Sequence, residues 1–357
     1  MDVAPDGRMA SVEASAVQAR VSEALATSRA HAAAAAAGEV PGTGRAGSAV
    51  RCGHAHELKP WHPGVHAAAL HMLSTPRGAG PRWHCQEATR LELLAARSTR
   101  RAAHSPCAEW RTDLAPPETH LSQAVARAVR DAPWHRKSAE RPAAQVADVV
   151  GRWGGPERAA FCASACLLAQ VWPSILAELS VLVRQVGVVD GSRIAGFTDF
   201  TTHGAIFVNR RRMVRHGKGV PAVVRYAEAL VRGGTHTRCN AAQVTAPFLR
   251  DERDRPWAQT PPRPGSRPSA ALFRQLVALV RSRELYARML SAAPAPPVVR
   301  GAAEQAIGER YLLLDGQARR AAAGLLPLRG ALTEHGVRVL TQVEKTLASH
   351  VTAAVPE

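Results

Sequence analysis

One short window of the sequence holds side chains that could bind an ion, inside a segment that reads as a helix. It begins at Tyr226 and reads YAEALVRGGTHTRCNA, so that Arg232, two glycines and His236 fall within five residues. Each glycine inside a helix costs about 1 kcal/mol relative to alanine. Helix stability therefore does not account for Gly233 and Gly234, and we expect that plain packing does not account for them either.

His236 could take part in a metal site. Cys239 lies three residues further on and shares the face of His236 on a continuing helix. His203 precedes the helix closely enough to approach it, as do Asp199 and His216. A site of His236, Cys239 and His203 is therefore one hypothesis. The alternative is a hydrogen-bonded histidine of the core.

Arg232 suggests a different chemistry, the binding of an anion. A guanidinium group beside the backbone amides of two glycines could hold a carboxylate, such as that of a 2-oxo acid or an acidic peptide. Arg263 and Arg267 are further candidates for the same carboxylate. The alternative is that Arg232 extends from the helix to solvent.

A second group of candidate ligands is the histidine-rich stretch GHAHELKPWHPGVHAAALH. Clustered histidines could bind a transition metal. Pro60 and Pro63 interrupt the stretch, however, and no carboxylate or cysteine completes a recognisable ligand spacing, so solvated histidines near a helix start are the alternative. The five histidines are His54, His56, His62, His66 and His71.

Composition bounds the class of protein. The chain has 357 residues, 46% of them hydrophobic, which suffices for a sizeable core. Its formal net charge is +17, which raises nucleic acid as a partner. Only four of its 46 basic residues are lysine and only 4% of residues are aromatic, so the charge reads as the scattered arginine of a GC-rich bacterial genome. Nucleic-acid binding is therefore the weakest of the functional hypotheses.

The sequence carries no signal for export or for a membrane. It has no apolar run of eighteen residues and no signal peptide, so we expect a cytoplasmic protein without a membrane partner. None of the cysteines forms a CxxC pair, and we expect buried thiols, including Cys162 and Cys166 on one helical face. The six cysteines are Cys52, Cys85, Cys107, Cys162, Cys166 and Cys239.

The elements that must position these residues follow from the hydrophobic pattern. The first 50 residues read as an Ala-rich leader, helical over 9–37 and loosely attached, and residues 51–150 show only short helical patterns at 88–97 and 121–132. Residues 151–357 form the best-specified domain. Its predicted elements are a buried helical segment over 158–189 divided at Pro173, strands at 194–200 and 204–213, a helix from Pro221, a loop over 250–268, and helices over 269–291, 301–323 and 328–352. The fold class is mainly α with a small β-sheet (α+β).

Several blocks in residues 150–350 resemble one family, the HExxH-motif domains described as α-ketoglutarate-dependent peptide β-hydroxylases of bacterial peptide-modification systems. The order and spacing of the blocks carry the resemblance more than any single one. They are GAIFVN (204–209), YAEALV (226–231) with the window that ends in His236, RPW (255–257), residues 267–290, and RYLLLDGQARRAAAGLLPLRGALTEHG (310–336).

The resemblance implies a metal-binding helix whose motif is degenerate in this chain. Two histidines four residues apart lie on one face of a helix and hold one metal, with the intervening glutamate assisting. Here Arg232 stands at the first histidine, Gly233 at the catalytic glutamate, and only His236 is kept. A further ligand position falls on Arg274, or on Ala270 in the ungapped alignment. Arginine stays protonated and offers no lone pair to a metal.

Two functions therefore compete within the family. An active member would hold non-haem iron and α-ketoglutarate and hydroxylate a ribosomally made precursor peptide. A pseudoenzyme would keep the fold and the peptide groove and act as a binding or scaffolding partner of a peptide maturase. The substitutions at the motif argue against full activity.

Overall fold

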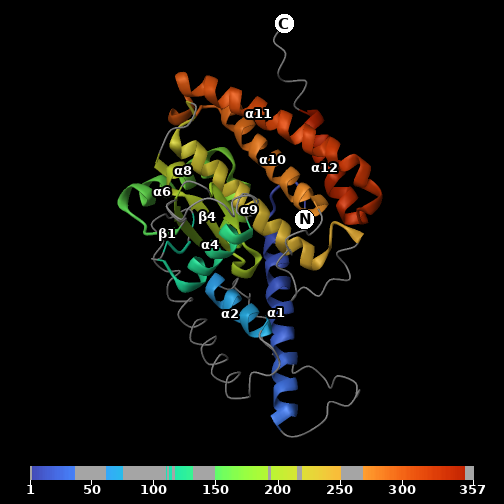
Figure 1. The fold of residues 1–357 in the computed structure, drawn as a ribbon. Coiled ribbons are helices and arrows are strands. Elements are labelled where there is room, and N and C mark those ends of the chain that lie inside the picture. The colour runs from blue at the N-terminus through green and yellow to red at the C-terminus, as the bar shows by residue number, and fades with distance from the viewer. Residues whose placement is uncertain are drawn as a thin grey trace, which may run out of the picture.

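The structure is a computed structural model and describes residues 2–36, 62–74, 110, 112–114, 117–131, 149–191, 194–214, 219–250 and 268–349. These residues are mainly helical and form one small sheet, which confirms the predicted fold class (Figure 1). No helix in this part of the chain is long and apolar enough to cross a bilayer. The predicted helix at 88–97 and the loop at 251–267 lie outside the described residues.

The sheet has the order β1-β2-β4-β3, with two buried parallel strands at its centre. β2 and β4 pair in parallel, and Gln185 lies opposite Ala205. The antiparallel strands β1 and β3 flank them. The runs VGVV and AIFV are continuous rather than alternating, as expected of strands covered on both faces. The four strands are β1 (Val149–Gly151), β2 (Gln185–Asp190), β3 (Gly196–Thr198) and β4 (Ala205–Asn209).

The long apolar segment at 158–189 is divided as predicted but is not helical throughout. Helix α6 (Gly155–Val171) ends before Pro173, which begins α7 (Pro173–Leu182) because its ring cannot continue the preceding helix. Residues 185–190 form β2, which corrects the expected helix. Valines dominate this stretch, and β-branched side chains favour a strand.

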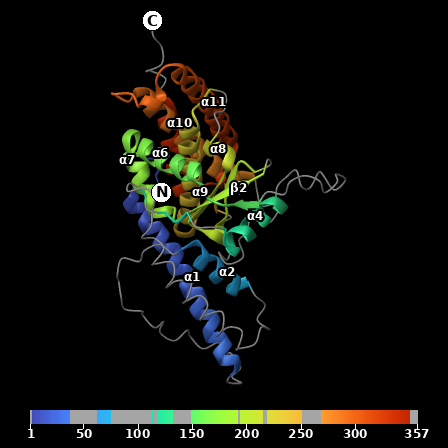
Figure 2. The ribbon, with the colours of Figure 1, turned by 90° about the vertical axis from the view of Figure 1, so that its left-hand side faces the viewer.

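Helix α9 (Ala222–Thr245) carries the window with His236 and follows Pro221 directly. The main core lies where α9 meets α6, α7, the sheet and α10 (Pro268–Ser291). α11 (Ala302–Leu325) packs on α10, and both lie together at one end of the molecule (Figures 1 and 2). α12 (Glu334–Ser349) begins later than predicted because residues 326–331 form a short 3-10 helix.

Helix α1 (Gly7–Ala36) differs from the loosely attached leader that the sequence suggests. Its first turns enter the core, where Glu13 pairs with Arg238 of α9 and the N–H of Asp6 donates to Glu178 of α7. The C-terminal end of the helix projects at the end of the molecule opposite α11 (Figures 1 and 2). The domain boundaries at residues 50 and 150 stay predictions.

Two further helices from the first half of the chain pack near α1 and the sheet. α2 (Pro63–Ser74) contacts α1, and α4 (Thr119–Asp131) contacts β1 and α2. The predicted helix at 121–132 is therefore confirmed, and the N-termini of α2 and α4 come close together. This junction places side chains from three distant parts of the sequence at one point.

Candidate functional site

The two glycines of the α9 window are explained by packing, which corrects the expectation from the sequence. A Cβ on Gly234 would stand 1.9 Å from Cδ2 of Leu179 in α7, and one on Gly233 would stand 3.0 Å from Cγ2 of Ile206 in β4. Both glycines therefore let α9 approach its neighbours closely. A glutamate at position 233 would have to displace Ile206, a buried residue of the central strand.

Arg232 and His236 lie on the face of α9 that meets α10. The Nη2 group of Arg232 donates to Oε1 of Gln275 over 2.7 Å, and Arg274 donates to Oε1 of Gln243 over 3.3 Å. Arg232 is half-buried rather than extended into solvent. The two positions where the resemblance implies metal ligands thus hold guanidinium groups on facing helices.

Burial, together with the positive charges of Arg232 and Arg274, lowers the pKa of His236 to about 3. The imidazole is therefore neutral at pH 7 and has a lone pair. A metal cation beside it would, however, face two positive charges that disfavour it in the same way as they disfavour the proton. The surroundings of His236 suit an anion better than a metal.

The replacement ligands proposed from the sequence do not converge on His236. Cys239 is buried, and burial raises the pKa of its thiol to about 11, so the thiolate that a metal needs is scarce. His203 lies beside His66 of α2, with ring centroids 5.6 Å apart, and Asp199 forms an ion pair with Arg127. Among the described residues, no cluster of metal-ligand type includes His236.

The other sequence candidates have varied positions. Arg263, Arg267 and His216 lie outside the described residues, as do His54 and His56. Cys166 is exposed, which corrects the expectation of a buried thiol, whereas Cys239 is buried as expected.

Arginines gather around one carboxylate next to Arg232. Glu228 of α9 accepts from Arg310 over 2.5 Å and from the hydroxyl of Tyr286 over 2.9 Å. Burial lowers the pKa of Arg212, on the short helix α8 (Arg210–Val214), and of Arg232, while the charge of Glu228 raises both. Arg212, Arg232 and Arg310 are thus three partly buried cations around the single carboxylate of Glu228. A bound anion would relieve their mutual repulsion.

A scan against models of known protein families gives no match, and neither does a search of curated proteins. The resemblance to HExxH-motif domains therefore stays a prediction from the sequence blocks.

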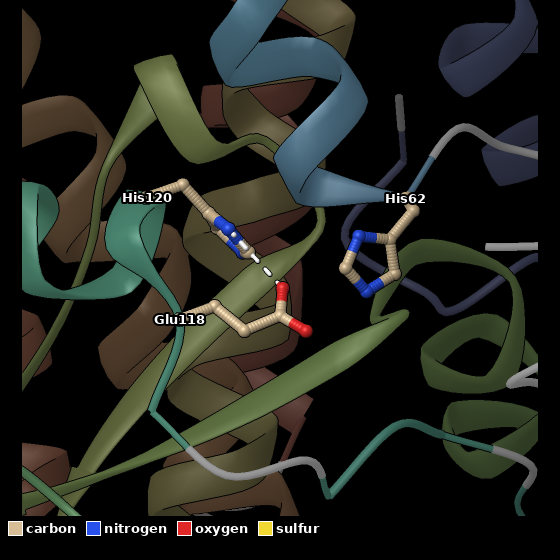
Figure 3. Close-up of side chains that lie close together, drawn as sticks. All are labelled: His62, Glu118 and His120. Carbon is tan, nitrogen blue, oxygen red and sulfur yellow. Dashed lines mark ion pairs between the residues drawn. The ribbon is translucent and has the colours of Figure 1, made fainter. Parts of the chain in front are cut away.

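A cluster of metal-ligand type lies elsewhere, at the junction of α2 and α4. His62, Glu118 and His120 each place one ligand atom within 4.8 Å of the other two (Figure 3). Nδ1 of His120 is 3.4 Å from Oε2 of Glu118. His62 belongs to the histidine-rich stretch, but Glu118 and His120 are more than 50 residues away, and no sequence spacing signals them.

Two polar side chains hold the histidines of this cluster from outside. Nε2 of His62 is 3.2 Å from Oδ2 of Asp113, and Nε2 of His120 is 2.8 Å from Oε1 of Gln185. Gln185 is the fully buried first residue of β2, and Asp113 forms backbone hydrogen bonds to Arg184 and Val186 beside it. The imidazole rings are therefore oriented by groups fixed on the sheet.

The remaining histidines of the stretch have different surroundings. His71 is exposed near the far end of α2. His66 is buried beside His203, and none of the described residues offers a hydrogen-bond partner to His66 Nε2 or His203 Nδ1. A cavity of about 20 Å³, lined also by Gln18 and Arg184, adjoins both rings. That volume matches one water molecule rather than a substrate.

Proposed function

We propose that this chain is a non-catalytic relative of the HExxH-type peptide β-hydroxylases, a cytoplasmic pseudoenzyme that binds an acidic segment of a precursor peptide or of its maturase. The observation that carries the proposal is the pair of arginines, Arg232 and Arg274, that flanks His236. Cations stand where a metal-dependent relative needs lone pairs, and Gly233 supplies no carboxylate for acid–base chemistry.

The same groups support binding of a carboxylate. Arg232 and Arg274 present guanidinium groups from two helices that pack against each other. In the part of the chain that the structure describes, each donates a hydrogen bond to the neutral side-chain oxygen of a glutamine. A carboxylate competes well with a neutral amide, since charge-assisted hydrogen bonds are about twice as strong as neutral ones. Arg212 adds positive potential from α8.

The binding test uses a fluorescein-labelled hexaglutamate peptide, its hexaglutamine counterpart and fluorescence anisotropy at one fixed salt concentration. We expect the wild-type chain to bind the acidic peptide only, and Arg232→Gln and Arg274→Gln each to weaken binding about tenfold, the equivalent of 1.4 kcal/mol. Arg319→Gln is the matched control. It also removes one positive charge, from a partly exposed ion pair with Asp315 on α11.

Equal weakening in all three variants would show that only global charge attracts the peptide and would overturn the proposal, as would no binding by the wild type. A second measurement tests the enzyme. Full-length protein is reconstituted anaerobically with Fe²⁺ and α-ketoglutarate, and bound iron and succinate are measured. Iron that depends on His236 together with succinate formation would identify an active hydroxylase instead.

A further inference from the structure

We propose that His62, Glu118 and His120 form a zinc-type divalent-metal site that joins α2, α4 and the sheet. Two imidazole nitrogens and one carboxylate, with a fourth position for water, are a ligand set that Zn²⁺ accepts. Ca²⁺ and Mg²⁺ prefer oxygen ligands and fit it less well. The side chains of His62 and His120 are 11% exposed and that of Glu118 is 22% exposed, which leaves access for an ion and its water.

The backbone fixes these side chains at helix starts. The carbonyl of His62 accepts from the N–H groups of Val65 and His66 in the first turn of α2. The carbonyl of Glu118 accepts from Leu121 and Ser122 at the start of α4 in the same way. Ligands on helix starts are held more rigidly than ligands on loops, so the cluster is preorganised.

The hydrogen bonds assign the lone pairs of the cluster. Gln185 Oε1 can only accept, so Nε2 of His120 carries the proton and Nδ1 carries the lone pair, 3.4 Å from the Glu118 carboxylate. A cation between this lone pair and the carboxylate would make their contact attractive. A metal ion, or a second proton on His120, would be such a cation.

His62 is oriented in the same sense. Its Nδ1 accepts from the N–H of Gly64 over 3.2 Å, which is long for a hydrogen bond. Because Nδ1 is the acceptor, Nε2 carries the proton and donates it to Asp113. A metal would take over this lone pair. Histidine ligands in metal sites usually donate their outer N–H to a carboxylate or carbonyl, which is the role that Asp113 and Gln185 fill here.

The absence of a side chain at Gly64 leaves space between the imidazole rings of His62 and His120. A Cβ on this residue would lie 3.1 Å from Nδ1 of His120 and 3.3 Å from Nδ1 of His62. A side chain at position 64 would therefore enter the region between the two nitrogens that we assign to the metal.

The experiment uses untagged, full-length protein stripped with EDTA, then titrated with ZnCl₂ by calorimetry and with CoCl₂ by visible absorption. We expect one Zn²⁺ per chain, the intense d–d bands of four-coordinate Co²⁺, and a raised thermal midpoint in the metal-bound protein. His120→Gln and Glu118→Gln should each weaken zinc binding at least tenfold. His71→Gln is the matched control on the same helix and should leave the affinity unchanged.

Gly64→Ala keeps the test falsifiable if a ligand variant fails to fold. Alanine favours a helix over glycine, so apo Gly64→Ala should be folded by circular dichroism and yet bind zinc at least tenfold more weakly. No zinc binding by folded wild type would overturn the proposal and assign the cluster to a proton shared by His120 and Glu118. Zinc bound equally by His120→Gln but lost in His236→Gln would overturn both this site and the non-catalytic reading of α9.

Discussion

Gly234 of α9 lies directly against Leu179 of α7, so closely that a Cβ at position 234 would stand 1.9 Å from the Cδ2 atom of the leucine. Leu179 is fully buried and has little room to move. The contact sets how near α9 lies to α7. It also explains why a residue that disfavours helices occupies the middle of a long helix.

Gly234→Ala should therefore destabilise the protein by about 1–3 kcal/mol, the usual cost of overpacking a core, although alanine favours a helix. The matched control is Gly308→Ala in α11, where an added Cβ meets nothing within 4 Å. That change should stabilise by up to about 1 kcal/mol. Urea unfolding followed by circular dichroism measures both, and equal effects of the same sign would contradict the packing argument.

Introducing the HExxH residues that the resemblance implies should not create a metal site. The double variant Arg232→His with Gly233→Glu brings back the motif residues, but the new side chain at 233 starts 3.0 Å from Ile206 and Arg274 keeps its charge beside His236. We expect no bound iron above wild type and a loss of about 1–3 kcal/mol in stability. The variant is made in a His120→Gln background, so that metal at the α2–α4 cluster does not mask the result. One iron per chain would show that the α9 site needs only these two changes.

Much of the architecture could be predicted because local signals are strong in the second half of the chain. Pro173 marked the break in the apolar segment, and Pro221 marked the start of α9. The apolar run that contains Ile206 predicted the strand β4. β2 was missed because a short buried strand and a buried helical segment have the same apolar pattern. The position of α1 was missed because alanines give a weak apolar face, whereas its attachment depends on the buried charge of Glu13.

The sites were harder to predict than the elements. His62 was a candidate, but its partners Glu118 and His120 are brought to it only by the packing of α2 against α4. The window at His236 suggested a metal or an anion, and the anion that we propose depends on the charge of Arg274, which lies beside His236 on a different helix. The resemblance had pointed to Arg274. No spacing along the chain relates His62 to Glu118 and His120, because tertiary contacts make that cluster.

Glu178 is predicted to be the most sensitive charged residue of the core. It is fully buried, pairs with Arg238 of α9 and Arg281 of α10, and accepts the N–H of Asp6. Glu178→Gln leaves the two buried arginines with one carboxylate, Glu13, and should cost about 3–5 kcal/mol. Glu284→Gln, which breaks a partly exposed pair with Arg288, should cost no more than about 0.5 kcal/mol. Comparable losses in chemical denaturation would show that burial of the Glu178 network does not matter.

Stability should fall in mild acid because of His66 and His203. Burial lowers the pKa of His66 to about 3 and that of His203 to about 4, from an ordinary 6.5, and Arg184 beside their cavity adds a positive charge. At about pH 7.5 and above, both imidazoles are neutral in the folded and unfolded chain, and stability is at its full value. As the pH falls from 6.5 towards 4, the unfolded chain binds protons that the folded chain does not. The free energy of unfolding should therefore drop by about 1.4 kcal/mol per pH unit for each histidine.

Urea unfolding at pH 7.5, 6.0, 5.5 and 5.0 measures this slope. The double variant His66→Gln with His203→Gln should remove both contributions to this slope, about 1.4 kcal/mol per pH unit each. An unchanged slope would mean that these histidines are protonated in the folded protein.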